Sequence, residues 1–480
     1  MKVDFKNKII NPVLRAIDKF YNSDWFVLFY SLVVLLSWTL ECEYIAIMTS
    51  VVVLIYMFLT QENLDRMALI AIVIPAMVDA GMGGRIKMSF IYMLIFLLLL
   101  VVASGIYYFV KVYKNNDRKL LKSHFFVFYA LTVLILCTSG LGYPGNTVLK
   151  VLIPVGVHLA LLGLYCILYK AGGPKLKDTI NKAIIALAGL IVAEMMIYFT
   201  RQNDVVYSII MKSMSLGWAI TNSVAVILAM AVPLCFYIAK DKKIQLPYML
   251  LATIFYAFIF LTNCRSMIVA GTAIYLICIV LSFIFLNRWQ SLVHLLLFAG
   301  VAFMAINKVF NQIFNQFLTM GLSDNGRMEL WNYYLGEFKE HPIFGMGFYT
   351  DAKYQIDGMV RAHNTIIQIV ASMGIIGILG AIPYYFQRYS LFVIKPTMYK
   401  LFAFVAYLAM VGYGLVDCAV ISSYKLIITY MLLLAVEYDT LEYTPMPLST
   451  TAWIKGLFGK SKKAKPDKLE ETCVEENVNE

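Results

Sequence analysis

The sequence predicts an all-α polytopic membrane protein with about 12 to 14 transmembrane helices and one long extracytoplasmic loop. Of its 480 residues, 61% are hydrophobic and only 14% are charged, whereas a soluble domain is about half apolar and a quarter charged. Apolar runs of roughly 16 to 22 residues recur along the chain, close to the length that crosses a hydrocarbon core of about 30 Å. The lysines and arginines lie mostly in short segments between these runs.

Fourteen candidate membrane spans follow from these apolar runs, with boundaries good to about 2 to 4 residues. They are Trp25–Leu40, Tyr44–Leu59, Met67–Met82, Phe90–Val110, Phe125–Thr138, Val148–Tyr169, Ala183–Phe199, Ala219–Ala239, Leu246–Thr262, Met267–Leu286, Leu292–Ile306, Thr365–Phe386, Leu401–Leu415 and Leu426–Tyr438. The shorter runs are candidates for half-spans.

The basic segment before Trp25 lacks the apolar core and the cleavage site of a signal peptide, so we expect it to stay in the cytoplasm. Alternating the loops from there places 28 of the 40 Lys and Arg inside and the other 12 outside. Cytoplasmic loops are expected to hold this excess. The pattern predicts a multi-pass protein of the cytoplasmic membrane with both termini cytoplasmic.

These assignments divide the chain into five predicted parts, of which the long outer loop is unusual because loops of that length are usually functional. The parts are a basic cytoplasmic segment (1–24), a helical bundle (25–306), the extracytoplasmic loop (307–363), C-terminal transmembrane helices (364–438) and a charged cytoplasmic tail (439–480).

Other classes of function are disfavoured by composition. The net charge of +11 is spread over short loops rather than one basic face, so we expect no nucleic-acid partner. The eight cysteines include no C-x-x-C pair and no His/Cys cluster with metal spacing. Gly345-Met346-Gly347 follows no predicted strand, which argues against a nucleotide site.

Two helices are predicted in the long loop. Apolar residues on one face of 310–318 predict a helix lying in the membrane interface. A turn at 323–326 then opens a second helix, with Arg327 in its first turn. A guanidinium beside free backbone N–H groups suits phosphate oxygens, although on position alone a solvated or ion-paired arginine is the commoner interpretation.

The second half of the loop contains a motif of specific spacing. Its parts are Arg327 four residues before Trp331, the turn His341-Pro342-Ile343-Phe344-Gly345-Met346-Gly347, and His363-Asn364 opening an apolar helix with Gly374 and Gly377. A weaker motif, Thr262-Asn263-Cys264-Arg265-Ser266, lies between two spans. Together they resemble the O-antigen ligase and polymerase family of bacterial membrane glycosyltransferases. That family often has Thr-x-Ser-Arg-Gly at the second motif, so Cys264 and Ser266 depart from it.

The resemblance implies a GT-C-like fold and an inverting glycosyltransferase whose donor is a glycan on undecaprenyl pyrophosphate, without metal or cofactor. His363 would be the catalytic residue, acting as a general base on an acceptor hydroxyl. Arg327 and Arg265 would hold the pyrophosphate, and Arg361 and Asn364 would complete the substrate site. Expected partners are a glycan or lipid-linked acceptor, membrane lipids, and proteins of chain-length control or export. The Lys-, Ile- and Asn-rich composition favours polymerase over ligase.

Several polar residues lie at or near the predicted outer face. Five arginines fall there, against the positive-inside trend: Arg85, Arg201, Arg265, Arg327 and Arg361. Three acids fall near the outer ends of spans, where pairing is the commonest role: Asp79, Glu194 and Asp417. The mid-span His158 is expected to bond a neighbouring helix, and Gly374, Gly377 and Gly380 to permit close helix packing.

A transporter or flippase of lipid-linked sugars is the alternative function, since it would also need many spans and outer arginines. Transporters often show repeats and interrupted helices at matching positions of two halves. The sequence has no convincing internal repeat, and transport gives no reason for His363-Asn364 at the end of a long loop.

Overall fold

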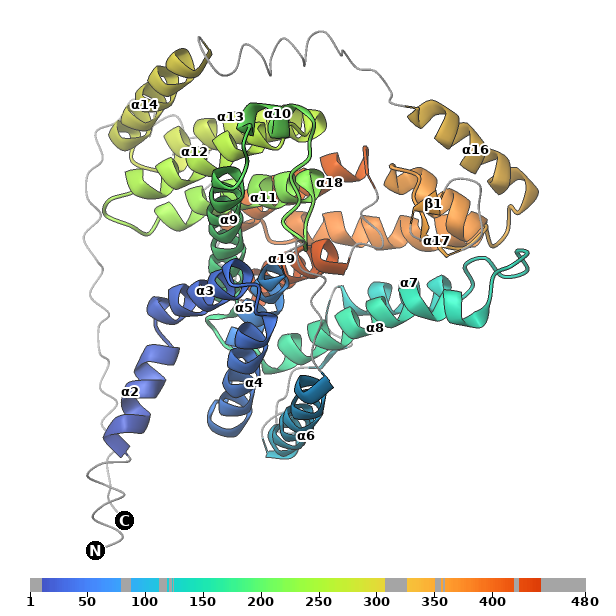
Figure 1. The fold of residues 1–480 in the computed structure, drawn as a ribbon, viewed down its shortest axis with the longest axis horizontal. Helices are drawn as coiled ribbons and strands as arrows, with labels where there is room; N and C mark the ends of the chain where they lie inside the picture. Colours follow the sequence, from blue (N-terminus) through green and yellow to red (C-terminus); the bar gives the residue numbers. More distant parts are fainter. Residues whose placement is uncertain are drawn as a thin grey trace, which may run out of the picture. The chain divides into compact units, whose positions relative to one another are not determined.

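The computed structural model of the chain is helical almost throughout the part that it describes (Figure 1). It describes residues 11–78, 88–111, 119–120, 123, 125–306, 326–349, 355–356, 359–417 and 423–441. Two short strands, β1 (Gln355–Ile356) and β2 (Met359–Val360), pair antiparallel just before His363. The predicted all-α fold class is confirmed.

Each predicted apolar run coincides with helix. Twelve runs are single helices: α3 (Asp24–Thr39), α4 (Glu43–Thr60), α6 (Met88–Lys111), α7 (Phe126–Leu136), α8 (Val148–Ala171), α9 (Leu176–Thr200), α11 (Thr221–Ala239), α12 (Leu246–Leu261), α13 (Arg265–Phe285), α14 (Arg288–Ile306), α18 (Met398–Gly414) and α19 (Ser423–Leu441). Another run is α17 (Thr365–Val393), which is interrupted at Gly374. The third run is broken into α5 (Asp65–Val73) and a 3₁₀ turn, η2 (Ile74–Met77). Within the described part of the chain, three further helices are α2 (Asn11–Tyr21), α10 (Val205–Ile210) and α16 (Arg327–Glu340).

Six of these helices are long and apolar enough to cross a membrane: α4, α8, α9, α11, α13 and α17. The pair α2 and α3, bent by 75°, would be a seventh span if it crosses as one unit. Shorter apolar helices include α7, α12 and α18. The chain is therefore a polytopic membrane protein, and the expected count of 12 to 14 spans requires the shorter helices to cross as well.

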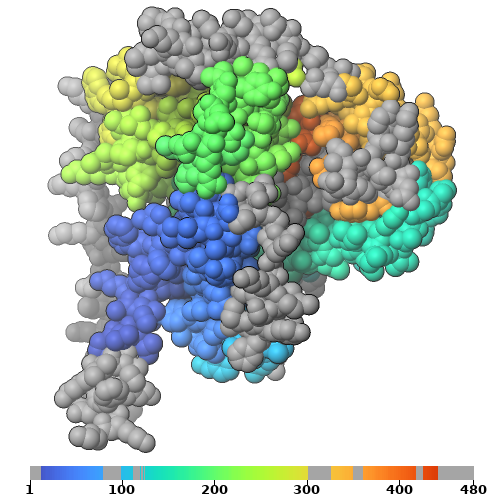
Figure 2. Space-filling view, in the orientation of Figure 1, coloured from blue at the N-terminus to red at the C-terminus, as the bar shows by residue number. Residues whose placement is uncertain are grey.

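The core of the bundle surrounds α11. Almost all its residues are buried, and it packs against α9, α12, α13 and α18. An apolar helix in a membrane protein can face either lipid or other helices, and the burial of α11 shows that other helices cover it. A second packed group contains α7, α16 and α17, and Figure 2 shows the orange surface of α16 and α17 adjoining the teal surface of α7 and α8.

A break in α17 receives the turn formed by residues 341–347. Gly374 leaves the helical conformation, with φ 61° and ψ −156°. The N–H of Ile375, which loses its helical partner there, donates to Pro342 O at 2.8 Å. In return the N–H of Met346 donates to Ala371 O at 2.8 Å. The turn therefore substitutes for one turn of the helix backbone and fixes α16, which precedes it, against α17.

Gly374 and Gly380 each require glycine for a different physical reason. A Cβ at Gly374 would lie 2.5 Å from Ile343 O, and its positive φ is strained for any other residue. The prediction that Gly374 serves close helix packing is therefore incomplete, because its backbone conformation also requires glycine. The prediction is confirmed for Gly380, where a Cβ would lie 2.5 Å from the Ile135 side chain of α7.

Two predicted intramembrane polar residues are paired. His158 on α8 is buried, and its Nδ1 lies 3.1 Å from the hydroxyl of Tyr129 on α7, as expected for a helix-bridging histidine. Glu194 is fully buried and accepts a hydrogen bond from Trp218 Nε1 at 2.9 Å. Both contacts give these side chains a structural role in the bundle.

Arg201 also has a structural role, because its guanidinium makes a cation–π contact with Trp38 at 5.4 Å from the ring centre. Arg85, Asp79 and the predicted interfacial helix at 310–318 lie outside the described residues.

Candidate active site

His363 stands immediately before the first turn of α17. Asn364 is the N-cap, and its Oδ1 accepts the N–H groups of Ile366 at 2.9 Å and Ile367 at 3.1 Å. Its Nδ2 donates to Leu415 O at 3.0 Å, which ties the start of α17 to the end of α18. Asn364 therefore places His363 structurally, and the prediction that it also contacts substrate stays a prediction.

The backbone of His363 is itself unusual. Its φ of 48° lies in the left-handed region that non-glycine residues rarely occupy. Such strain persists only where the surroundings hold it, and it is concentrated at functional sites. Here the conformation is fixed by the Asn364 cap on one side and by contacts to Ala362 on the other.

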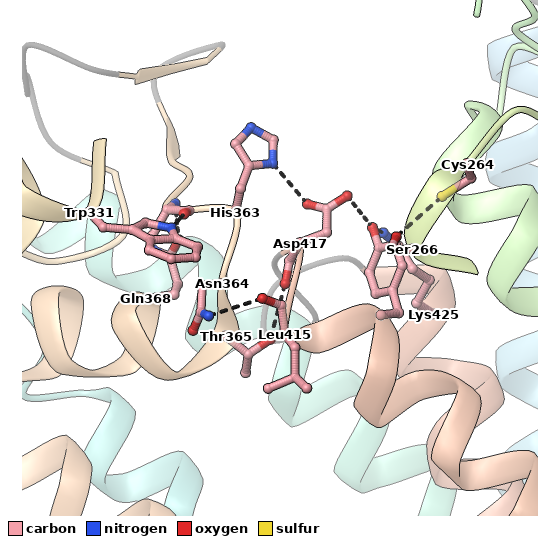
Figure 3. A network of polar contacts seen from close by, with 12 residues as sticks. Cys264, Ser266, Trp331, His363, Asn364, Thr365, Gln368, Leu415, Asp417 and Lys425 are labelled. Carbon is pink, nitrogen blue, oxygen red and sulfur yellow. Dashed lines mark hydrogen bonds and ion pairs between the residues drawn. The ribbon is translucent and has the colours of Figure 1, made fainter. Parts of the chain in front are cut away.

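Ala362 is held at both ends of its backbone. Its carbonyl oxygen accepts the indole N–H of Trp331 at 2.8 Å, and its N–H donates to Gln368 Oε1 at 2.9 Å. Gln368 in turn donates through Nε2 to Ser372 Oγ at 2.8 Å. These bonds join α16 to α17 through the residue that precedes His363 (Figure 3).

The imidazole of His363 faces Asp417, just after the end of α18 (Figure 3). Nδ1 lies 3.3 Å from Asp417 Oδ1, and the two side chains are 32% and 14% exposed. Thr365 Oγ1 also donates to the backbone oxygen of Asp417 at 3.2 Å. An ionised carboxylate can only accept hydrogen bonds, so Nδ1 carries the proton of a neutral imidazole. That tautomer leaves the lone pair on Nε2, the arrangement of a general base oriented by an acid.

Arg327 and Arg265 each begin a helix. The N-cap of α16 is Gly326, in the left-handed conformation with φ 77°, and it has no side chain to cap the helix. The N-cap of α13 is Cys264, whose side chain makes no capping hydrogen bond. Each arginine is thus the first residue of its helix, at the positive end of a helix dipole, which favours anions.

Lys212 brings these two arginines into one electrostatic group. The pKa of the Lys212 ammonium is lowered by partial desolvation, then by the positive charges of Arg265 and Arg327, whereas Cys264 raises it. Both arginines therefore act on the same lysine through their positive charge. We call Lys212, Arg265 and Arg327 the cation cluster.

The backbone around Lys212 is tied to that of Arg265. The amide of Asn263 donates to the carbonyl oxygens of Ile209 at 3.3 Å and Ile210 at 3.2 Å, at the end of α10. Both Lys212 and Asn263 have positive φ, 53° and 48°. The loop after α10 is therefore fixed to the segment that opens α13.

Arg361 lies near Tyr349. Burial raises the pKa of the Tyr349 hydroxyl, and the positive charge of Arg361 acts in the opposite direction. Among the described residues no contact joins Arg361 to the cation cluster, so its predicted role in substrate binding stays a prediction.

Three side chains near the end of α16 could offer ligand atoms to a metal ion. Atoms of Glu337, Glu340 and His341 lie within 4.8 Å of one another. Glu337 already accepts a hydrogen bond from Tyr143 at 3.1 Å. Burial, and next the negative charge of Glu337, raise the pKa of the Tyr143 hydroxyl to about 12. Exposed carboxylates often lie this close without a metal, so the arrangement does not assign one.

Sequence reasoning identified His363, Arg327 and Arg265, but it missed Lys212 and the partner of His363. Asp417 was noted only as an acid at the end of a span. A signal for Lys212 existed, because it is one of the 12 cations assigned to the outer loops.

The comparison with protein families agrees with the predicted resemblance. The family model described as O-antigen ligase matches residues 249–382, from α12 to α17. The match is less than half of the chain, but it contains Arg265, Arg327 and His363. No curated protein sequence matches the chain.

Proposed function

We propose that this chain, whose residues 249–382 form an O-antigen ligase domain, is an inverting, metal-independent glycosyltransferase with a glycan on undecaprenyl pyrophosphate as donor. The observation that carries the proposal is the pair formed by His363, just before α17, and Asp417, just after α18 (Figure 3). A carrier would need the cations but has no use for an oriented base.

In the proposed reaction, the hydroxyl of an acceptor sugar attacks the anomeric carbon of the donor. Nε2 of His363 takes the hydroxyl proton while the new glycosidic bond forms. The bond from the anomeric carbon to the pyrophosphate oxygen breaks, and undecaprenyl pyrophosphate leaves with the bonding electrons. Asp417 stabilises the imidazolium that results, as the acid of a base–acid pair does. General base catalysis typically contributes about 10²- to 10⁴-fold.

The cation cluster would bind the leaving pyrophosphate. Negative charge grows on its oxygens as the bond breaks, and fixed donors aimed at developing charge are usually the largest catalytic contribution. Arg265 and Arg327 offer planar donor pairs that match phosphate oxygens, while Lys212 adds a compact charge. The uncapped N-termini of α13 and α16 support the same anion.

The proposed location is the cytoplasmic membrane, with the site on the outer face and both termini inside. The 28-to-12 distribution of Lys and Arg over the predicted loops supports this orientation. The acceptor would be a glycan or a lipid-linked sugar. We favour polymerisation over ligation on composition, with chain-length or export proteins as partners.

The test is a transfer assay with purified protein in detergent, undecaprenyl-pyrophosphate glycan, an acceptor and a chelator. The expected result is a longer or transferred glycan together with released undecaprenyl pyrophosphate. The transporter alternative makes the opposite prediction. Protein in vesicles would then move lipid-linked glycan across the bilayer without forming any glycosidic bond, and the transferase proposal would be wrong.

A further inference from the structure

Asp417 is held from the side opposite His363 by a second pair of residues. The hydroxyl of Tyr413, in the last turn of α18, donates to Asp417 Oδ2 at 2.7 Å. Lys425 on α19 donates through Nζ to the hydroxyl oxygen of Tyr413. The ammonium also lies 4.1 Å from the centre of the Tyr413 ring. The result is a continuous chain of contacts from Lys425 to His363 (Figure 3).

The direction of every hydrogen bond in this chain is fixed by chemistry. An ammonium group can only donate and an ionised carboxylate can only accept. The Tyr413 hydroxyl between them must accept from Lys425 and donate to Asp417. Asp417 must then accept from His363 Nδ1. A hydroxyl whose two roles are both set in this way has one orientation, so the carboxylate that it holds is oriented as well.

Burial makes this arrangement costly to break. Lys425 is 4% exposed and Tyr413 is 1% exposed. A buried ammonium is expensive unless an opposite charge and hydrogen bonds compensate it. Asp417 supplies a compensating charge through Tyr413, and Lys425 in turn favours the ionised form of Asp417. Tyr413 and Lys425 therefore act on the electrostatics of the site as well as on its geometry.

We propose that Tyr413 and Lys425 are positioning residues that act through Asp417 to orient His363 and keep its Nε2 free to accept a proton. This inference rests on the proposed function, because it assigns a role within that reaction. Neither residue touches the substrate in this scheme, and both lie outside residues 249–382, which match the family model.

The expected effects on the transfer reaction follow from the charges. Tyr413→Phe removes the hydroxyl but keeps the ring, and Lys425→Met removes the charge but keeps the length of the side chain. Each should lower kcat about 10-fold, the scale of one hydrogen bond to a charged group. KM for the donor should stay within about 2-fold, since binding by the cation cluster is untouched.

The pH profile separates a positioning role from a merely structural one. Without the positive charge or the hydrogen bond, protonation of the Asp417–His363 pair becomes easier, and the protonated pair cannot act as base. The acidic limb of the kcat profile should therefore move to higher pH by about 0.5 to 1 unit in both variants. Lys425→Arg, which restores a charged donor, should recover most of the activity and the original limb.

Tyr399→Phe is the matched control. Tyr399 lies near the opposite end of the same helix, is also buried, and donates its hydroxyl to Asn181 Oδ1 at 3.0 Å. Loss of the Tyr399 hydroxyl should leave the acidic limb of the kcat profile in place. An unchanged kcat and acidic limb in Tyr413→Phe would overturn the proposal while transfer by the wild type upholds the proposed function. If Lys425→Met does not fold, Tyr413→Phe alone decides. A wild type that forms no glycosidic bond would instead overturn the proposed function.

Discussion

The indole N–H of Trp331 donates to the backbone oxygen of Ala362, 2.8 Å away, and so couples α16 to the residue before His363. Trp331 stands one helical turn after Arg327 on α16. The two residues of the arginine-to-tryptophan motif noted in the sequence thus have different roles. Arg327 belongs to the cation cluster, and Trp331 fixes the helix that carries it against the loop that carries the histidine.

Trp331→Phe tests this coupling. The variant keeps an aromatic side chain but loses the donor to Ala362, so the position of His363 becomes less fixed. We expect kcat to fall about 10-fold, because small displacements of a catalytic group are costly. Trp289→Phe is the control, since Trp289 is 76% exposed on α14 and should retain activity. Equal activity of the two variants would argue against a positioning role for the Trp331 bond.

Gly374→Ala tests the break in α17. The new Cβ would lie 2.5 Å from Ile343 O in a backbone conformation with φ 61°. We expect a loss of stability of about 1 to 3 kcal/mol, measured as a lower Tm of the purified protein. Gly189→Ala in α9 is the matched control, because a Cβ there meets nothing within 4 Å. An undiminished Tm in Gly374→Ala would contradict the account of the break.

His363→Ala tests the base. The side chain is partly exposed in a loop, so the variant should insert and fold normally. Its transfer rate should fall by roughly 10²-fold or more, the scale expected when a general base is lost. The transfer rate of Asp417→Asn should fall as well. Adding Asp417→Asn to His363→Ala should lower the transfer rate little further, because the two residues act as one unit. Unchanged transfer in His363→Ala would keep the reaction and reject the assignment.

Arg327→Lys tests the cation cluster. The compact ammonium keeps the charge but cannot grip phosphate oxygens with two donors, so most activity should be lost. Lys212→Met should raise KM for the donor, with a weaker dependence of KM on salt, since one fewer charge attracts the pyrophosphate. Arg361→Lys should matter less than Arg327→Lys. Full transfer by Arg327→Lys would mean that pyrophosphate recognition lies elsewhere.

The proposed orientation is tested by labelling in intact cells. A cysteine introduced at Tyr354 should react with an impermeant thiol reagent, whereas one introduced at Lys462 should not. The wild-type chain, with its eight native cysteines, provides the background signal. Labelling at both positions, or only at Lys462, would reverse or break the predicted topology.

The sequence by itself determined the helices of this protein. Runs of apolar residues and their length are local properties, so each predicted span coincides with helix over most of its described residues. The start of α16 at Arg327 was likewise readable, because the turn residues before it and the helical spacing after it are local. The resemblance to a known family, carried by two local motifs, identified His363 and Arg265 as candidates.

Only the tertiary structure decided which residues act together. The pairing of His363 with Asp417 joins α17 to the end of α18, and the charges of Arg265 and Arg327 act on Lys212, which lies in a loop far earlier in the chain. Both relationships depend on how separate helices pack, which no local pattern encodes. The break at Gly374 was hidden for the same reason, since its left-handed backbone is needed only because the turn at 341–347 docks there. Packing, rather than sequence spacing, therefore determines the chemistry that the site can perform.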